Sequence, residues 1–582
     1  MGVCCSTRDT GRVKPNVKAV SEKSKAALSS FKQQQTELEI FVEKTIALEK
    51  PWTDPQFEPK ISSLVDPKID VNADKAAFVS YSWKRASEIY PSPAIFKGGI
   101  EPNDINQGAL GDCYFLAALS SLAEFPERVQ HMFVTKEVNK AGIYLIRFFL
   151  NGQETLVTVD DHLPVNAKGS PAFATSRDGE LWVSLLEKAW AKLHGTYART
   201  EGGLPCFAAS HIMGVPSESY HHDMLENTED FFEMLKSADR RNFIMMAASH
   251  GQGENRNEEG VISGHAYSLI SIHEIKDASG KEVKLLKLRN PWGKGEWSGD
   301  WSDGSSLWTP ALKKQVNFSS GDDGIFFIAL EDYIQHFSWT SICVENNDEK
   351  YKHSQLYHSF GAQDTSPMPQ AFFSFTLANP VDFHQHAFAI SVLQQGARLA
   401  NYRQVDPRKL FEPTNFNIVL MTESGEFVNA RFGNRFTFSL LNDHTSLKPG
   451  KYIIMIDPLW NQTTDNDAMY REVLVDIYAP EVVHLDQVAD AQGMQYLAKA
   501  LKHAAKTRTD QEAIQHYLNE SEDYGNDVYR ISDVECLNCW YGFVYTANNS
   551  KYELLETVRP QLEGLEVVYP DLVDDTDVEI SI

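Results

Sequence analysis

The stretch Gln107-Gly-Ala-Leu-Gly-Asp-Cys-Tyr-Phe-Leu-Ala-Ala-Leu119 indicates how the rest of the chain is organised. A run of good helix formers with apolar spacing begins at Cys113, which predicts a helix whose first turn carries this cysteine. A helix N-terminus has unpaired N–H groups and a partial positive charge, and both favour a nucleophilic thiolate. The amide of Gln107 is predicted to meet an oxyanion at the same place. The alternative is a buried structural cysteine.

Two further stretches carry the partners that such a nucleophile needs. His265 opens the alternating apolar run His-Ala-Tyr-Ser-Leu-Ile-Ser-Ile, and Asn290 closes another run, which ends at Pro291. Both residues are therefore expected at strand ends. In a Cys–His–Asn arrangement the imidazole takes the thiol proton and the amide orients the ring. A histidine held in the core or in a loop is the alternative for His265.

These motifs belong to a larger set of sequence features that resembles one known family. The set also includes Leu185-Leu-Glu-Lys-Ala-Trp-Ala-Lys192, Asn290-Pro-Trp-Gly293, Glu296-Trp297 and Trp301-Ser-Asp303. Over about Ser80 to Phe337 the chain closely resembles the calpain family of calcium-dependent cysteine proteases. The resemblance implies an α+β fold with a papain-like protease core of two subdomains. An antiparallel β-sandwich and a helical or mixed C-terminal region are expected to follow.

The resemblance also assigns roles to the active-site residues. Cys113 is the expected nucleophile, His265 the base and Asn290 the residue that orients the base. Gln107 and the backbone N–H of Cys113 are expected to form the oxyanion hole. Trp292 is expected to shield the His265–Asn290 bond and to keep the subdomains apart until calcium binds. A plain core aromatic is the alternative for Trp292.

Five segments are predicted from these motifs and from changes in composition. They are a basic, acylated N-terminal segment with a linker (1–74), a subdomain with the cysteine (75–203), a subdomain with the histidine and asparagine (204–343), a β-sandwich (350–482) and a helical C-terminal region with an acidic tail (483–582). A length of 582 residues is consistent with several domains.

Charge and cysteine content exclude some classes of protein. The net charge of −26 argues against a nucleic-acid binder, which needs a basic face, and is compatible with divalent cations. Seven cysteines without a pairing pattern indicate a reducing compartment. No apolar run is long enough to span a bilayer, and no secretory signal is evident.

The N-terminus carries a membrane signal of another kind. Met1-Gly-Val-Cys-Cys-Ser6 fits the myristoylation pattern with Gly2 as acceptor, and Cys4 and Cys5 are candidates for palmitate. One myristoyl chain binds membranes only marginally, so a second signal is needed. Basic residues that attract anionic lipid follow, namely Arg8, Arg12, Lys14, Lys18, Lys23, Lys25 and Lys32. We expect attachment to the cytoplasmic face of a membrane; a disordered tail with a chance pattern is the alternative.

The family resemblance implies a first calcium ion in the cysteine subdomain. Its expected ligands are the carbonyls of Lys97 and Gly99 and the carboxylates of Asp104 and Glu187, all of them oxygen donors that suit a hard cation. The alternative for Glu187 is a solvated helix acid paired with Lys188 or Lys192.

A second calcium ion is implied in the histidine subdomain. Its expected ligands are Glu296, Asp303 and Asp323 with the carbonyl of Gly321. Ile325 stands where the family has a glutamate, so the site is expected to be weaker, since affinity follows the number of charged ligands. Asp322 is a nearby acid that would compensate. Calcium is therefore expected as one or two ions.

Local patterns complete the sequence-based expectations. Tyr144–Leu150 and Thr155–Val159 are predicted to pair through Asn151-Gly152, and Leu181–His194 to form a helix. Ser249–Gly260 is expected to be a mobile loop ahead of His265. Leu485–Leu518 is expected to form two helices. No EF-hand loop is found. Cys536-Leu-Asn-Cys539 is expected to be two packed thiols; a structural zinc site, the alternative, needs two more ligands, for which His503 or His516 would have to fold back.

The leading hypothesis is a membrane-anchored, calcium-regulated endopeptidase that makes limited cuts in intracellular proteins. The alternative is a scaffold with a calpain-like fold and cytoskeletal partners, which the residue Ile325 favours and the intact Cys113, His265 and Asn290 oppose. A papain-like transglutaminase also uses Cys and His, but it usually pairs them with Asp.

Overall fold

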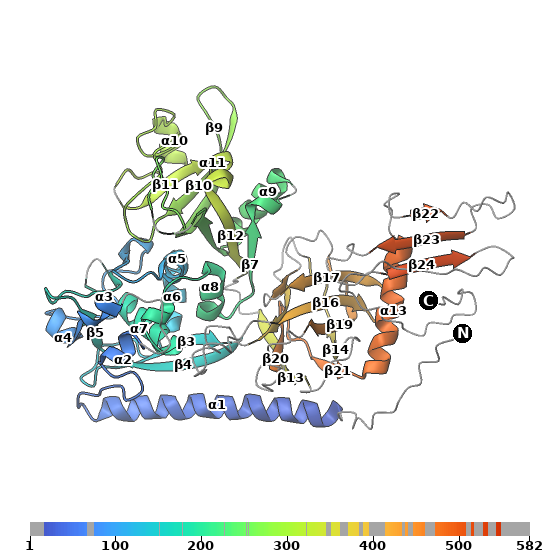
Figure 1. Ribbon diagram of the computed structural model, residues 1–582, viewed down its shortest axis with the longest axis horizontal. Coiled ribbons are helices and arrows are strands. Elements are labelled where there is room, and N and C mark those ends of the chain that lie inside the picture. Colours follow the sequence, from blue (N-terminus) through green and yellow to red (C-terminus); the bar gives the residue numbers. More distant parts are fainter. Residues whose placement is uncertain are drawn as a thin grey trace. The chain divides into compact units, whose positions relative to one another are not determined.

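The computed structural model describes most of the chain N-terminal to the β-sandwich and shorter segments after it. The described residues are 17–66, 75–150, 152–176, 179–225, 227–251, 253, 255–321, 323–344, 351–360, 371–382, 388–394, 414–433, 437–439, 446–459, 472–507, 514–516, 528–533 and 543–548. The chain forms two compact units, of which one contains Ser29–Glu349 and the other most of the chain that follows (Figure 1).

The first unit begins with helices and short strand pairs, which we call the cysteine half. Its elements after α1 (Val17–Ala47) are α2 (Ile61–Leu64), α3 (Lys75–Val79), β1 (Ser82–Arg85), α4 (Ala86–Ile89), η1 (Pro102–Asp104), β2 (Ile105–Asn106), α5 (Cys113–Leu122), α6 (Pro126–Met132), β3 (Ile143–Leu150), β4 (Gln153–Asp160), β5 (His162–Val165), β6 (Thr175–Ser176), α7 (Trp182–His194), η2 (Ala198–Thr200) and α8 (Pro205–Met213). The antiparallel pairs are β1–β5, β2–β6 and β3–β4. The predicted hairpin is confirmed, with Gly152 at φ +72° in its turn.

The N-terminal helix packs on this hairpin. Val42 of α1 is buried against Ile143 and Leu145 of β3 and Leu156 of β4. The side chain of Gln35 accepts a hydrogen bond from the Leu156 N–H at 2.6 Å. The described part of the expected linker after α1 also lies in the core: Phe57, Leu64 and Val65 are buried, and the buried Asp54 pairs with Lys192 of α7 at 2.6 Å.

The rest of the first unit, the histidine half, is built on a six-stranded antiparallel sheet. The strand order is β11-β10-β9-β8-β12-β7. The elements are β7 (Ser217–His221), η3 (His222–Met224), α9 (Thr228–Arg240), β8 (Ile244–Ser249), β9 (Ala266–Lys276), β10 (Glu282–Arg289), α10 (Pro310–Gln315), β11 (Ile325–Ala329), α11 (Leu330–His336) and β12 (Phe337–Cys343).

Helix α5 joins the two halves. The hydroxyl of Ser268 in β9 donates to the carbonyl of Ala117 at 2.9 Å, and that of Ser121 donates to the carbonyl of Met245 in β8 at 2.9 Å. Met245 lies opposite Leu269 of β9, so the two bonds attach α5 to neighbouring positions of β8 and β9. All ten residues of α5 are buried.

The second unit contains two antiparallel sheets that pack face to face. One sheet has the order β13-β20-β15-β18 and the other β17-β16-β19-β14-β21. The strands are β13 (Lys352–Ser359), β14 (Ala371–Leu377), β15 (Ala389–Leu393), β16 (Asn415–Thr422), β17 (Phe427–Gly433), β18 (Thr437–Ser439), β19 (Gly450–Leu459), β20 (Glu472–Ala479) and β21 (Asp486–Val488).

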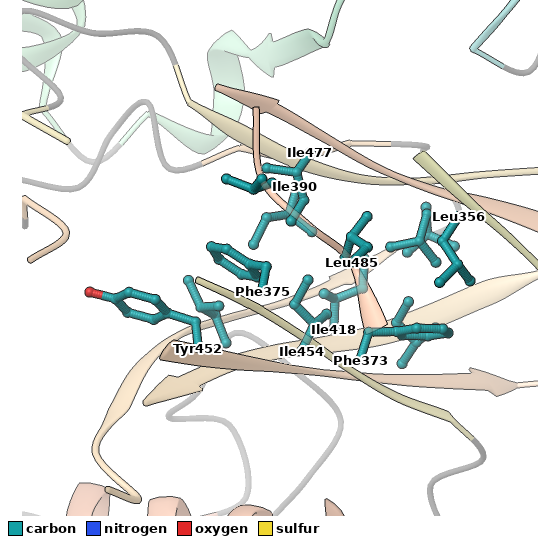
Figure 2. Close-up of a cluster of buried hydrophobic side chains, with 14 of the residues drawn as sticks. Leu356, Phe373, Phe375, Ile390, Ile418, Tyr452, Ile454, Ile477 and Leu485 are labelled. Carbon is teal, nitrogen blue, oxygen red and sulfur yellow. The ribbon is translucent and has the colours of Figure 1, made fainter. Parts of the chain in front are cut away.

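Alternate residues of the strands fill the space between these sheets. Figure 2 shows Leu356, Ile390 and Ile477 of the four-stranded sheet above Phe373, Ile418 and Ile454 of the five-stranded sheet. Residues one position along the strands, such as Phe372 and Val419, form a separate cluster on the other face of the five-stranded sheet. Adjacent apolar residues, such as Phe372 and Phe373, thus face opposite sides of the five-stranded sheet, which is covered on both faces.

Helix α13 (Asp490–Thr507) covers that other face. Leu497 and Ala500 pack with Phe372 and Val419. The expected second helix is wrong where the chain is described, because Ile514–His516 forms strand β22, which pairs with β23 (Val528–Asp533). Strand β24 (Phe543–Asn548) completes this three-stranded sheet. The apolar spacing around Ile514 did not indicate that this segment pairs with β23.

Candidate active site

Cys113 is the first residue of α5, as predicted. The carbonyl of Asp112, which precedes it, accepts hydrogen bonds from the N–H groups of Phe115 at 2.9 Å and Leu116 at 3.2 Å. The side chain of Cys113 is 8% exposed, so solvent reaches it only slightly. Because the helix is buried along its whole length, the partial positive charge of its N-terminus is poorly screened by water. This environment favours an anion at the position of the sulfur.

His265 and Asn290 are joined by a hydrogen bond. His265 directly precedes β9 and Asn290 directly follows β10, so both predicted strand ends are confirmed. The His265 Nε2 lies 2.9 Å from the Asn290 Oδ1. The Asn290 amide donates to the Gly295 carbonyl at 3.1 Å, which fixes its oxygen toward the imidazole. Nε2 must then carry the hydrogen, and Nδ1 is the nitrogen suited to accept a proton.

Aromatic side chains surround this hydrogen bond. The Trp292 ring centroid lies 4.8 Å from that of His265. The backbone N–H of Trp292 also donates to the Asn290 Oδ1 at 3.0 Å. Tyr267 meets the imidazole edge-on at 5.1 Å. His265 is 1% exposed and Asn290 is fully buried. Little water therefore competes for the bond that orients the imidazole.

The two halves of the first unit meet beside these residues. The backbone N–H of Gln107 donates to the carbonyl of Pro291 at 3.4 Å. Gln107 therefore lies beside the turn that follows Asn290, and Cys113 begins the helix six residues further along the chain.

The loop that carries Gln107 is held tightly. Its side-chain amide donates to the Leu110 carbonyl at 2.7 Å, while its buried Oε1 has no hydrogen-bond partner among the described residues. A Cβ on Gly108 would lie 2.4 Å from the backbone of Phe173, so only glycine fits there. Because a primary amide has two hydrogens, the bond to Leu110 still leaves one for an oxyanion.

The first predicted calcium group is only partly brought together. Glu187 is 2% exposed and both of its carboxyl oxygens accept from the Ala174 N–H, at 3.0 and 3.2 Å. Burial and the neighbouring Asp112 carboxyl raise the pKa of Glu187 well above its usual value. Lys188 and Lys192, the alternative partners of Glu187, pair instead with Asp160 and Asp54. Glu187 is therefore not a solvated acid, and its carboxyl group is bonded to Ala174 and not to the loop that contains Lys97.

Glu180 is the carboxyl group that reaches the Lys97 loop. It accepts hydrogen bonds from the Lys97 N–H and from the Trp182 indole, the latter at 2.9 Å. Burial raises the pKa of Glu180, and the nearby Asp104 raises it further. Glu180 lies two residues before α7, whereas Glu187 is the sixth residue of that helix. The sequence signal next to Glu180 is the turn dipeptide Asp178-Gly179. In the structure Gly179 adopts φ +72°.

The second predicted calcium group forms a cluster of carboxyl groups. Burial raises the pKa of Glu296 to about 7, with Asp303 and Asp323 adding to the effect. Burial and Asp323 likewise raise the pKa of Asp303 to about 6. The Asp303 Oδ1 is buried and finds no hydrogen-bond partner in the described part of the chain. Glu296 and Asp303 line a cavity of about 650 Å³. These groups have the donor chemistry and the excess negative charge that a cation would relieve.

The cluster is nevertheless open. Among the described residues, no three Asp, Glu, His or Cys side chains are arranged to hold one metal ion. Glu296 is occupied by the N–H groups of Asp323 at 3.2 Å and Gly324 at 3.0 Å, and Ile325 offers only a backbone N–H to Asp323, at 3.0 Å. The carboxyl groups of Glu296, Asp303 and Asp323 influence one another's pKa but are too far apart to bind one ion together. They would have to move closer to bind an ion. Asp322 lies outside the described residues.

The loop ahead of His265 is hydrogen-bonded to the segment that carries Glu296. The Ser298 N–H donates to the Glu259 carbonyl at 2.8 Å, and the Arg256 guanidinium donates to the Glu296 carbonyl at 3.4 Å. Gly260 adopts φ +94°, and a Cβ there would lie 2.1 Å from the Glu296 carbonyl oxygen. A movement of the Glu296 segment would therefore be passed directly to the loop that leads into His265.

The chain is similar in sequence to known cysteine proteases. The model of the calpain family of cysteine proteases matches residues 52–344, about half of the chain. The chain belongs to the calpain family. A calpain-type cysteine protease DEK1 of Zea mays is 36% identical over 336 residues, which are 54% of this chain and 15% of the relative. Calpain-9 of Homo sapiens is 34% identical over 275 residues, 46% of this chain and 39% of the relative.

A calpain of Schistosoma mansoni is 33% identical over 321 residues, 53% of this chain and 41% of the relative. The chain thus spans less than half the length of each of these calpains. The predicted lipidation residues Gly2, Cys4 and Cys5, and the pair Cys536 and Cys539, lie outside the described residues. In the part of the chain that the structure describes, no helix is long and apolar enough to cross a membrane.

Proposed function

We propose that this calpain is a calcium-dependent cysteine endopeptidase that performs limited proteolysis of intracellular proteins. The observation that carries the proposal is the buried hydrogen bond between His265 Nε2 and Asn290 Oδ1, next to the bond that the Gln107 N–H donates to the Pro291 carbonyl. That bond presents Nδ1 as the basic nitrogen, which is the orientation that a thiol nucleophile needs.

The residues divide the reaction as follows. His265 Nδ1 takes the thiol proton, and the Cys113 sulfur attacks the scissile carbonyl carbon. The Gln107 amide and the Cys113 N–H stabilise the oxyanion of the tetrahedral intermediate. The imidazolium then protonates the leaving amine as the C–N bond breaks and a thioester remains. Water, deprotonated by His265, attacks the thioester and releases the acid and the thiol. Asn290 holds the imidazole in one tautomer throughout.

The direct test is cleavage of casein and of a fluorogenic peptide by the purified protein, with calcium titrated. Cys113→Ala is the control because it removes only the sulfur. We expect calcium-dependent cleavage that the variant lacks. Cleavage by Cys113→Ala at the wild-type rate would refute the proposed nucleophile, and wild-type cleavage in a calcium chelator would refute the calcium requirement.

Two groups of residues are proposed to hold calcium. The first comprises the carbonyls of Lys97 and Gly99 and the carboxylates of Asp104 and Glu180, with Glu180 in place of Glu187. The second comprises Glu296, Asp303, Asp323 and the Gly321 carbonyl, and is weaker because Ile325 supplies no carboxylate. Bound calcium would neutralise these carboxylates. The chain's own part is to bring the loops at Asp104 and Glu296, and with them Gln107 and His265, into their working positions.

We also propose that N-terminal acylation holds the enzyme at the cytoplasmic face of a membrane. Gly2 would carry myristate and Cys4 or Cys5 palmitate, since one chain alone anchors weakly. Expression with an alkyne analogue of myristate tests this: label should enter the wild type but not Gly2→Ala. Loss of Cys4 and Cys5 together should release the myristoylated protein from anionic vesicles.

A scaffold without activity is the second candidate, because Ile325 removes one charged ligand from the second calcium group. An electrophilic thiol probe separates the two candidates. Labelling of Cys113 that depends on His265 supports the enzyme, whereas absence of both labelling and cleavage at every calcium level supports the scaffold with cytoskeletal partners.

A further inference from the structure

Arg289 is a fully buried arginine beside the predicted catalytic residues. It is the last residue of β10 and directly precedes Asn290. The Arg289 Nε donates to the Asn103 Oδ1 at 3.0 Å, its Nη1 to the Ser120 hydroxyl at 3.1 Å, and its Nη2 to the Ile105 carbonyl at 3.0 Å. Each nitrogen of the guanidinium thus has a partner, as the burial of a charged group requires.

The three partners come from three elements of the cysteine half. Asn103 lies in η1, Ile105 in β2 and Ser120 in α5, while Arg289 belongs to the sheet of the histidine half. Because the guanidinium is planar and rigid, its three bonds fix the directions as well as the distances between these elements. Lysine, with one flexible ammonium group, cannot reproduce that geometry.

These bonds lie close to the catalytic groups on both sides. Ile105 is two residues before Gln107, and Ser120 lies two turns along the helix that begins at Cys113. On the other side Arg289 is covalently joined to Asn290, and the next residue, Pro291, accepts the Gln107 N–H at 3.4 Å. The segment Arg289-Asn290-Pro291 is therefore bonded to the cysteine half both before and after Asn290.

We propose that Arg289 is a positioning residue that sets the distance between the Cys113–Gln107 pair and the His265–Asn290 pair. It touches no reacting atom. Its bonds hold β10 against α5 and β2, and Asn290 transmits that position to the imidazole. The kinetic part of the proposal rests on the proposed peptidase function, whereas its effect on thiol reactivity can be measured without any peptide substrate.

The test compares Arg289→Lys with Arg128→Lys in the full chain. Arg128 is a matched control because it is also buried: it donates to the Asn242 carbonyl at 3.0 Å and lies 3.9 Å from the centre of the Phe125 ring. These partners lie outside α5, the Gln107 loop and the Asn290 turn. Near-UV circular dichroism and the unfolding temperature establish how much of each variant is folded under the assay conditions.

Two readouts separate positioning from stability. For Arg289→Lys we expect kcat to fall about 100-fold with KM nearly unchanged, since a displacement of about 1 Å between reacting groups costs about that much. We also expect alkylation of Cys113 by iodoacetamide to require higher pH, because the imidazole no longer meets the thiol. Arg128→Lys should leave both quantities unchanged per folded molecule, even if it unfolds at a lower temperature.

A second variant covers the case in which Arg289→Lys does not fold. Ser120→Ala removes a single bond and leaves the arginine in place, and it should produce smaller changes of the same kind in kcat and in the alkylation profile. Unchanged kcat and an unchanged alkylation profile in either Arg289→Lys or Ser120→Ala would overturn the proposal. So would equal losses per folded molecule in Arg289→Lys and Arg128→Lys. A wild type without peptidase activity would refute the proposed function, and the alkylation profiles would still decide the role of Arg289.

Discussion

The carboxyl group of Glu180 accepts a hydrogen bond from the backbone N–H of Lys97, 83 positions earlier in the chain. The bond ties the start of α7 to the loop that leads to Asp104 and then to Gln107. Glu187, which lies within α7, interacts with Ala174 and Asp112 instead. Two acids of the same segment thus perform different tasks, and this difference can be measured.

We predict that Glu180→Gln raises the calcium concentration for half-maximal activity by roughly tenfold, because the first site loses a charged ligand. Glu187→Gln, the matched control, should leave that concentration unchanged, since this buried group has a raised pKa and interacts with Ala174 and Asp112. Calcium titrations of peptide cleavage measure both. A larger shift for Glu187→Gln than for Glu180→Gln would restore Glu187 as the ligand.

The carboxyl cluster predicts a pH dependence of stability without calcium. The pKa of Glu296 is raised from 4.5 to about 7, so the folded state binds more protons than the unfolded state between these values. The free energy of unfolding should therefore fall as pH rises from about 4.5 to 7. Deprotonation also prepares the cluster for a cation, so calcium should bind more tightly across the same range and release protons.

Thermal unfolding in a calcium chelator, at several pH values from 5 to 8, tests this. The comparison of wild type with Glu296→Gln isolates one group from the other titrating residues. We expect the variant to lose part of the decrease in unfolding temperature. Parallel curves for the two proteins would show that Glu296 does not titrate as its surroundings require.

Gly260 should be intolerant of a side chain. In Gly260→Ala the new methyl group would meet the Glu296 carbonyl 2.1 Å away, so the loop ahead of His265 must move. We expect kcat/KM to fall at least tenfold, with a stability loss of about 1–3 kcal/mol. Gly280→Ala is the matched control, because Gly280 has a similar φ of +86° but a Cβ there would have no atom within 4 Å. Equal effects of the two substitutions would mean that backbone strain, not the contact, matters.

Gly493 offers a test in the second unit. Alanine is normally better than glycine in a helix by about 1 kcal/mol. A Cβ on Gly493 of α13 would, however, lie 2.1 Å from the ring of Phe372, which is fully buried and has no room to move. We therefore expect Gly493→Ala to destabilise this unit by about 1–3 kcal/mol. Calorimetry should show this loss, while the exposed Gln492→Ala should change little.

The sequence predicted the parts of the site that local pattern determines. A helix beginning at Cys113, a strand after His265 and a strand ending at Asn290 each follow from apolar spacing and from Gly or Pro at the ends. The hairpin through Gly152 follows from its turn residues. The relative position of these pieces came from the family resemblance and not from periodicity.

Contacts between distant segments were beyond the reach of pattern. Glu180 and Glu187 are both acids near one helix, and only the fold decides which of them meets Lys97. Arg289 ends an apolar strand, where a charged residue is not expected from the pattern. Its hydrogen-bond acceptors Asn103, Ser120 and Ile105, all more than 160 residues earlier, stabilise the buried guanidinium. Ile514 has helical spacing with its neighbours, yet it pairs with β23 because a sheet partner is present.

The complete burial of α5 also limits how such an enzyme can diversify. A substitution on any face of that helix disturbs the packing around Cys113. Such a substitution therefore lowers the stability of the fold before it can alter the choice of substrate. Under the proposed function, changes of substrate preference are therefore expected in the loops around α5 and not in the helix itself.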